Sequence, residues 1–222
     1  TDVLQRVDDG RGIKTRVELR GVGENLQDHL QIRTVFKVSS VDTLNTTSAS
    51  LWGKFKIGLE YMFNRSGPMA MAPSQLGCFT KSSQEHNRPN LQYHIQPLSL
   101  EKFGETLHNF DAFTASVCNL RPTSRGKIHI TSSDLKTHPT IDPNYLDTDE
   151  DRKIGAEAIR LTRDIVLNTE AFRKCQPEEI LPGATLQSDD DLSKAAGDIG
   201  TTIFHPVGTC KMGSIDDETS VV

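Results

Sequence analysis

The chain has 222 residues, of which 35% are hydrophobic and 25% charged, and its formal net charge is −5. This length and composition allow one well-sized hydrophobic core with an appendage. The acidic balance, without a basic stripe, argues against a nucleic-acid partner, and no apolar run approaches the ~20 residues that an integral membrane segment needs.

The four cysteines are widely spaced and form no C-x-x-C pair. The seven histidines are scattered along the chain, so the sequence contains no zinc-like cluster and we expect no metal site. The first residues lack the basic and apolar regions of a signal peptide. We therefore expect four reduced thiols in a cytoplasmic protein, with a peripheral position at a membrane as the alternative.

Residues 14–19 predict a short extended segment, which leads into the glycine-punctuated block GVGENLQDHL at 21–30. Residues 31–38 are rich in β-branched and aromatic side chains at their centre and predict a strand. Apolar residues recur with helical spacing over 51–64, and a glycine–proline pair follows this stretch. The first third of the chain is therefore expected to hold a strand followed by a helix.

Residues 90–97 alternate between apolar and polar side chains, which predicts a half-buried strand with His94 on its polar face. Residues 112–120 and 127–131 predict two further strands. Because a turn over 122–126 joins them, we expect these two strands to form an antiparallel hairpin.

Residues 149–168 predict a long helix, which Thr148 can cap and which begins with acidic side chains that suit a helix N-terminus. Its expected buried stripe contains Ile154, Ala158, Leu161 and Ile165. A second, shorter helix is expected from Ser188 to about Ala196, and an extended segment over 200–204 then leads to His205.

Strands arranged as hairpins and followed by helices favour an α+β fold, with an antiparallel sheet flanked by helices. A doubly wound sheet would need strands and helices in regular alternation, and the sequence lacks that rhythm. The chain also lacks a complete dinucleotide fingerprint, because Leu26 stands where the glycine pair Gly21 and Gly23 would need a third glycine. Any large cofactor must therefore be held mainly by sequence outside this chain.

The most informative segment is FHPVGTCKMG at 204–213. His205 precedes a proline, which favours an extended backbone at the histidine, and Gly208 allows the backbone to approach a flat ligand closely. A histidine held in this way can act as a general base near neutral pH. A structural histidine in a turn explains the same spacing, so the pattern by itself does not decide between the two.

Three segments together resemble the glucose–methanol–choline family of oxidoreductases: HPVGTCKMG at 205–213, GVGENLQDHL at 21–30, and the run from SRGKIHI at 124–130 to PTIDPNYL at 139–146. They occur in the order found in that family. The resemblance implies FAD as cofactor, and it implies oxidation of a primary alcohol, choline-like or other, to an aldehyde by hydride transfer to the flavin. It favours the choline-dehydrogenase-like branch of the family, chiefly because of the last segment.

The resemblance also implies roles for single residues. His205 corresponds to the family's histidine beside the reactive end of the flavin and is the expected catalytic base. Pro206 and Val207 are expected to contact the cofactor. His94 and Phe204 are candidate substrate contacts, although a hydrogen-bonded or solvent-facing histidine and a core-packed phenylalanine explain these two positions equally well.

The resemblance divides the chain into three expected regions. Residues 1–30 border the flavin domain, residues 31–200 form the substrate-binding domain, and residues 201–222 return toward the flavin domain with the catalytic histidine. In the family the dinucleotide-binding region precedes the first block, and a second catalytic residue, His or Asn, follows the last. We therefore expect an internal part of a longer enzyme, inactive by itself, that lacks the dinucleotide-binding region and the extreme C-terminus.

Two classes of function remain open at this point. The first is the substrate-binding part of an FAD-dependent alcohol oxidoreductase, either an oxidase or a dehydrogenase, since these differ in an electron acceptor that the sequence does not identify. The second is a non-catalytic binding module derived from the same fold, which the incomplete fingerprint would also fit.

Overall fold

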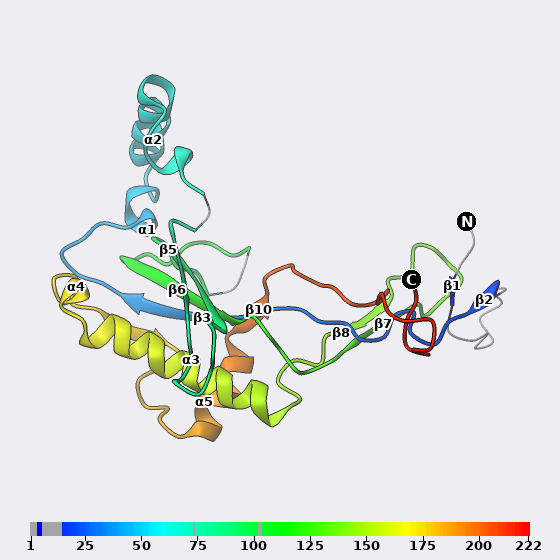
Figure 1. Cartoon of the computed structure of the whole chain (residues 1–222). Helices are drawn as coiled ribbons and strands as arrows, with labels where there is room; N and C mark the ends of the chain where they lie inside the picture. The colour runs from blue at the N-terminus through cyan, green and yellow to red at the C-terminus, as the bar shows by residue number, and fades with distance from the viewer. Residues whose placement is uncertain (1–3, 6–14, 73, 102–103) are drawn as a thin grey trace. The chain divides into compact units, whose positions relative to one another are not determined.

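The computed structural model describes residues 4–5, 15–72, 74–101 and 104–222. The chain forms two compact units, and each is described here by itself (Figure 1). Unit 1 comprises three segments, Thr1–Leu30, Arg121–Asp151 and Thr202–Val222, and unit 2 comprises two, Gln31–Leu120 and Arg152–Thr201. Residues 121–151, which lie inside the expected substrate-binding region 31–200, group with the two ends of the chain in unit 1.

Unit 2 is built on a six-stranded sheet. Five strands follow the order β10-β3-β6-β5-β4, and the sixth, β9, pairs with β3. The pairs β3–β6, β3–β9, β4–β5 and β5–β6 are antiparallel. The strands are β3 (Leu30–Lys37), β4 (Leu76–Thr80), β5 (Leu91–Gln96), β6 (Ala112–Asn119), β9 (Glu178–Leu181) and β10 (Gly200–Thr202). The helices are α1 (Leu44–Thr47), α2 (Leu51–Asn64), α3 (Asp149–Asn168), α4 (Glu170–Arg173) and α5 (Asp189–Asp198), with a 3-10 turn η1 at Pro68–Ala70. The fold is α+β, an antiparallel sheet flanked by helices, which confirms the class expected from the sequence.

One face of the sheet carries the hydrophobic core of unit 2. Phe36 of β3 stacks on Phe113 of β6, with 5.6 Å between the ring centroids, and Val166 of α3 packs in the same cluster. The fully buried positions of α3 also include Ile159 and Thr162. The predicted stripe was therefore correct at Ile154 and Ala158 but wrong at Leu161 and Ile165, which are only half-buried. In the second half of α3 the buried stripe is shifted by one residue, to Thr162 and Val166.

Tyr93 of β5 joins this core to α3 through a hydrogen bond of 2.9 Å between its hydroxyl and that of Thr162. Burial raises the pKa of Tyr93 to about 12, and the bond to Thr162 partly opposes that effect. In an unfolded chain a tyrosine ionises near pH ~10. Between these two values the unfolded state loses a proton that the folded state keeps, so the stability from Tyr93 is complete below pH ~10 and is lost as the pH rises toward 12.

We therefore expect the free energy of unfolding to fall by on the order of 2 kcal/mol over this alkaline window. Urea unfolding at a series of pH values, followed by circular dichroism, measures the change. The variant Tyr93→Phe keeps the ring in the core but removes the ionisable group, so its slope should be clearly smaller. An equal slope in both proteins would show that Tyr93 does not cause the alkaline loss.

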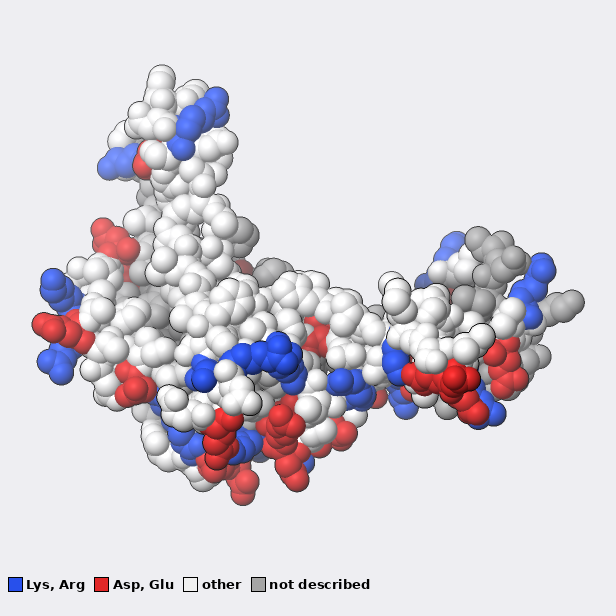
Figure 2. Space-filling model, in the orientation of Figure 1, with Lys and Arg blue, Asp and Glu red and all other residues white. Residues whose placement is uncertain are grey.

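Helix α2 occupies the range that the apolar periodicity predicts, Leu51–Asn64. It begins where the Ser50 hydroxyl accepts a hydrogen bond of 2.9 Å from the amide of Gly53, as expected of an N-cap. It buries none of its residues, and Figure 2 shows a largely uncharged surface over it with a few basic side chains. Its apolar stripe is therefore exposed in this chain, at Leu51, Trp52, Phe55, Met62 and Phe63.

Unit 1 contains two small sheets. Strands β1 (Leu4–Gln5) and β2 (Val17–Glu18) are parallel partners, and Lys14 at the start of the predicted extended segment lies outside the described residues. Strand β7 (Lys127–His129) pairs with β8 (Thr140–Asp142) in antiparallel register.

The expected hairpin between residues 112–120 and 127–131 was wrong, because β6 pairs inside unit 2 whereas β7 pairs with β8 in unit 1. The residues of the expected turn have other partners. The amides of Thr123 and Ser124 donate to the Asp151 carboxylate at 3.0 and 2.8 Å, and Gly126 exchanges two backbone hydrogen bonds of 2.9 Å with Leu26. These contacts lead the chain away from β6 before β7 begins.

All four cysteines are free thiols. Within the described ranges, no group of three or more His, Cys, Asp or Glu side chains could hold a metal ion. No helix among the described residues has both the length and the apolar character to cross a bilayer.

Candidate active site

Two segments of unit 1, far apart in sequence, run side by side as an antiparallel ladder. Gln27 and Val207 exchange two backbone hydrogen bonds of 2.8 Å. On one side of this pair the amide of Ile203 donates to the carbonyl of His29 at 3.3 Å, and on the other the amide of Gly23 donates to the carbonyl of Thr209 at 3.0 Å. The structure therefore brings the sequence blocks 21–30 and 204–213 together, although the chain separates them by most of its length.

Gly208 is required where the two segments come closest. Its φ is +97°, a conformation that side-chain-bearing residues rarely adopt. A Cβ atom there would lie 2.3 Å from the carbonyl oxygen of Asn25, and the Asn25 amide group donates to the Gly208 carbonyl at 3.2 Å. The glycine thus serves close approach of two backbones, whereas the sequence suggested close approach of a flat ligand.

The ladder presents four consecutive exposed side chains, those of Phe204, His205, Pro206 and Val207. Phe204 is 68% exposed and Val207 is 61% exposed, so Phe204 is not packed in a core within the described chain. Phe204 also has a φ of +64°, in the left-handed region that non-glycine residues rarely occupy. The predicted base and its three predicted neighbours therefore share one accessible edge of unit 1.

His205 lies next to a second histidine that the sequence did not place there. The Nδ1 atoms of His205 and His29 are 3.4 Å apart, and the rings meet edge to face, with centroids 5.5 Å apart. A hydrogen bond between the two Nδ1 atoms requires that one of them carries a proton and the other does not. The adjacency follows from the ladder, because His29 is two residues beyond Gln27 and His205 two residues before Val207.

A carboxylate beneath this turn receives three hydrogen bonds. Asp28 is only 7% exposed. Its Oδ1 accepts from the amide of His205 at 2.9 Å, and its Oδ2 accepts from the Thr202 hydroxyl at 2.5 Å and from the Tyr145 hydroxyl. Nothing in the sequence points to this carboxylate as part of the site, apart from its place in the block at 21–30.

These residues fit one part of a flavin and not the rest. An exposed imidazole flanked by phenylalanine, proline and valine side chains can lie against a flat aromatic ring system. The described part of unit 1 has no glycine-rich loop before a helix that would cradle a diphosphate. Pro206 and Val207 would therefore suit contact with the ring end of FAD, whereas the described part of unit 1 would not hold its diphosphate.

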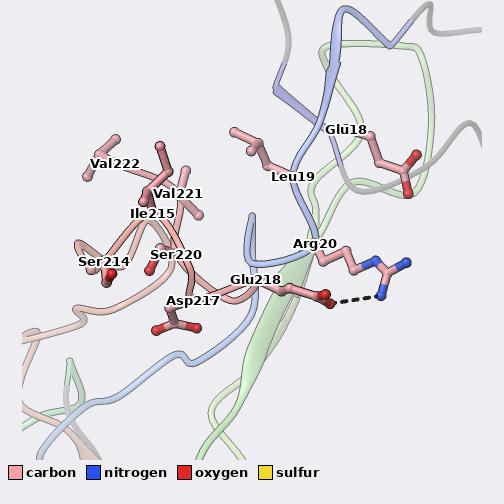
Figure 3. A pocket seen from close by; sticks show the side chains of 11 residues that line it. Glu18, Leu19, Arg20, Ser214, Ile215, Asp217, Glu218, Ser220, Val221 and Val222 are labelled. Atoms are coloured by element: carbon pink, nitrogen blue, oxygen red, sulfur yellow. Dashed lines mark hydrogen bonds and ion pairs between the residues drawn. The ribbon is translucent and has the colours of Figure 1, made fainter.

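A separate hollow of about 650 Å³ lies in unit 1, between residues 18–20 and the last ten residues of the chain (Figure 3). Its charged lining includes an ion pair of 3.2 Å between Arg20 and Glu218. None of the residues 204–207 lines it. Because it lies apart from the candidate base and its neighbours, we do not assign it to the substrate.

His94 lies in unit 2, on the sheet face opposite the hydrophobic core. The register pairs it with Gly77 of β4 and Ser116 of β6, and Ser116 in turn with Arg33 of β3. His94 is half-buried, Ser116 is fully buried and Arg33 nearly so. Burial lowers the pKa of the Arg33 guanidinium.

The comparisons with known proteins agree on one family. The profile of GMC oxidoreductases matches residues 122–222. The chain is 39% identical over 204 residues to an oxygen-dependent choline dehydrogenase of Citrobacter koseri, covering 92% of this chain and 36% of that protein. It is 36% identical over 222 residues to the enzyme of the same name from Pectobacterium atrosepticum, covering 100% of this chain and 38% of that protein.

Solved structures show the same fold. A formate oxidase superposes with a TM-score of 0.79 at 25% identity, over 90% of this chain and 40% of that one. A pyridoxine 4-oxidase from Mesorbium loti superposes with a TM-score of 0.73 at 21% identity, over 95% of this chain and 37% of that one. The chain thus spans well under half the length of each of these relatives.

Proposed function

We propose, from the premise that this chain belongs to the GMC oxidoreductase family, that it forms the substrate-binding part of an FAD-dependent enzyme that oxidises a primary alcohol to an aldehyde. The observation that carries the proposal is the exposed edge of unit 1, where His205 stands between apolar side chains on a hydrogen-bonded ladder. In this proposal His205 is the catalytic base, Pro206 and Val207 contact the cofactor, and Phe204 contacts the substrate.

His205 is suited to accept the proton of the substrate hydroxyl. An imidazole can take up a proton near neutral pH, and its exposed position leaves it accessible to a ligand. Removal of the hydroxyl proton raises the electron density on oxygen, which weakens the adjacent C–H bond toward loss of hydride. Bound FAD would supply the acceptor for the two electrons of that hydride.

The neighbourhood of His205 favours an enzyme over a non-catalytic module. A strained backbone persists only where the surrounding structure imposes it, and such residues gather at functional sites. Phe204, with its positive φ, immediately precedes the candidate base. The strained turn beside the candidate base is therefore consistent with a catalytic role for this segment.

The polar face of the unit 2 sheet is the proposed substrate surface. Within the described residues, Gln96 Oε1 and Ser116 Oγ are buried without a hydrogen-bond partner. Buried polar atoms usually have a partner, so these two are suited to a polar group of a ligand. His94 lies on the same face, between Gln92 and Gln96 in β5, and we include it among the proposed substrate contacts. Choline is the substrate named for the curated relatives, and a choline-like or other primary alcohol is proposed for this enzyme.

The direct test is a half-reaction with the flavin-loaded enzyme under anaerobic conditions. A panel of primary alcohols, comprising choline, linear aliphatic alcohols and benzyl alcohol, is mixed with the enzyme while the visible flavin absorbance is followed. At least one alcohol should bleach that absorbance and yield one aldehyde per flavin. If dithionite bleaches the flavin but no alcohol does, the proposed function is wrong. The isolated chain should neither retain FAD through gel filtration nor oxidise any of the alcohols.

A further inference from the structure

Asp28 joins three separate parts of unit 1 at one buried carboxylate. Its partners are Tyr145 from the segment after β8, Thr202 at the end of β10 and the backbone amide of His205. Hydrogen bonds to an ionised acceptor are among the stronger ones in proteins. Neither the proposed cofactor contacts nor the proposed substrate contacts involve this carboxylate. Its three hydrogen bonds therefore need another explanation.

The three bonds converge on the strained turn. The Thr202 hydroxyl, which donates to Asp28, also accepts a hydrogen bond of 2.9 Å from the amide of Phe204. Asp28 itself accepts from the next amide, that of His205. The orientations of two successive peptide groups, on either side of the left-handed Phe204, are therefore set directly or indirectly by the same carboxylate.

We propose that Asp28 is a positioning residue, which holds the Phe204–His205 turn in its left-handed conformation and so aims the His205 ring outward. This inference rests on the proposed role of His205 as the base. Asp28 does not touch the substrate in this proposal, because its carboxylate lies beneath the turn and all three of its bonds are made to this chain. Tyr145 and Thr202 hold the carboxylate in place from the other side.

A simpler explanation is that Asp28 only stabilises unit 1. The two explanations differ in what a small change at the carboxylate does. If Asp28 is merely structural, a variant that still folds should keep full turnover. If it positions the base, the variant should lose turnover without loss of substrate affinity, because a displacement of about 1 Å at a reacting group can cost on the order of a hundredfold in rate.

Tyr145 supplies a readout that does not depend on catalysis. Burial and the hydrogen bond to the Asp28 carboxylate raise the pKa of the Tyr145 hydroxyl. Removal of the negative charge should lower that pKa while the tyrosine stays half-buried. The chain contains three tyrosines, so the variant Tyr145→Phe identifies which step of an ultraviolet tyrosinate titration belongs to Tyr145.

The experiment compares Asp28→Asn, Thr202→Val and the control Asp216→Asn, which changes an exposed aspartate of the same unit. In the chain itself, amide hydrogen exchange at Phe204 and His205 is measured by NMR, with Phe36 of the unit 2 core as the internal reference. Asp28→Asn is expected to speed exchange at His205 about tenfold or more and to lower the pKa of Tyr145. Thr202→Val, which keeps the carboxylate, should speed exchange at Phe204 in particular.

In the flavin-loaded enzyme, Asp28→Asn is expected to lower kcat by about ten- to a hundredfold, with KM within a few-fold of the original and the flavin retained. Asp216→Asn should change neither constant. Thr202→Val tests the same turn should Asp28→Asn fail to fold, and it is expected to lower kcat in the same direction by a smaller factor.

The outcomes separate this inference from the proposed function. The positioning role is wrong if Asp28→Asn and Thr202→Val both leave amide exchange and kcat unchanged. If His205→Ala lowers kcat strongly in the same series, the assignment of His205 as the base still stands. Full turnover in His205→Ala would overturn the base assignment, and the positioning role with it. Faster exchange and lower kcat in the Asp28 variant, with an unaltered Asp216 control, supports the proposal.

Discussion

Replacement of His205 by alanine is expected to lower alcohol turnover by roughly 10²- to 10⁴-fold, the range that a general base contributes. The loss should appear in kcat, because the substrate hydroxyl would keep its proton in the absence of the imidazole. The side chain is exposed and lies against His29, so the fold should be retained. Steady-state kinetics, together with the visible flavin spectrum of the purified variant, measures both quantities.

The matched control is His138→Ala, which removes another exposed histidine of unit 1. It should leave turnover unchanged. Added imidazole should restore part of the activity of His205→Ala and none to the control, because a free base can occupy the space that alanine leaves. Full activity in His205→Ala would contradict the assigned role, and a variant that has lost its flavin would point to a cofactor-holding role for the histidine instead.

Replacement of Arg163 by methionine is expected to lower the free energy of unfolding by about 3–5 kcal/mol, the usual cost of leaving one partner of a buried ion pair alone. Arg163 of α3 forms a bidentate pair with Glu179 of β9, with Nε–Oε2 and Nη2–Oε1 distances of 2.8 and 2.9 Å. The side chains are 13% and 2% exposed. Arg163 also donates to the carbonyls of Leu186 and Gly183 at 2.8 and 3.1 Å, so its loss also removes the partners of two carbonyl groups.

Urea unfolding followed by circular dichroism measures the change. The double variant Arg163→Met with Glu179→Leu should recover much of the loss, since it leaves no buried charge without a partner. Arg160→Met serves as the matched control on the same helix, because Arg160 pairs with Asp189 at an exposed site and exposed pairs contribute less than about 1 kcal/mol. Equal losses in the two arginine variants would show that the buried pair has no special weight in holding β9 against α3.

The sequence was sufficient for the elements that local signals define. Helix α2 has the predicted bounds, and α3 spans the predicted range 149–168. In both, the apolar periodicity and the first residues of the helix carry the information, and these lie within one stretch of chain. Strands β3, β5 and β6 also lie within the predicted ranges to within one or two residues. The family followed from three sequence blocks, and the comparisons confirm it.

Strand pairing was predicted less well. Residues 127–131 carry a strand pattern, but nothing in that pattern states whether the partner precedes or follows it in the chain. The structure pairs β7 with the later strand β8, because the intervening residues bind Asp151 and Leu26 instead of closing a turn. Residues 121–151 consequently belong to unit 1, whereas the sequence placed them with the substrate-binding region.

For the candidate site, the sequence by itself determined the family, the residue types and the one histidine that can act as a base in the segment 204–213. Only the tertiary structure decided which groups surround that histidine. Asp28 and Tyr145 lie 177 and 60 positions away along the chain, and His29 lies 176 positions away. The reason is physical, since periodicity and capping report contacts within a few residues, whereas a carboxylate that collects donors from two other segments of the chain exists only after those segments have come together.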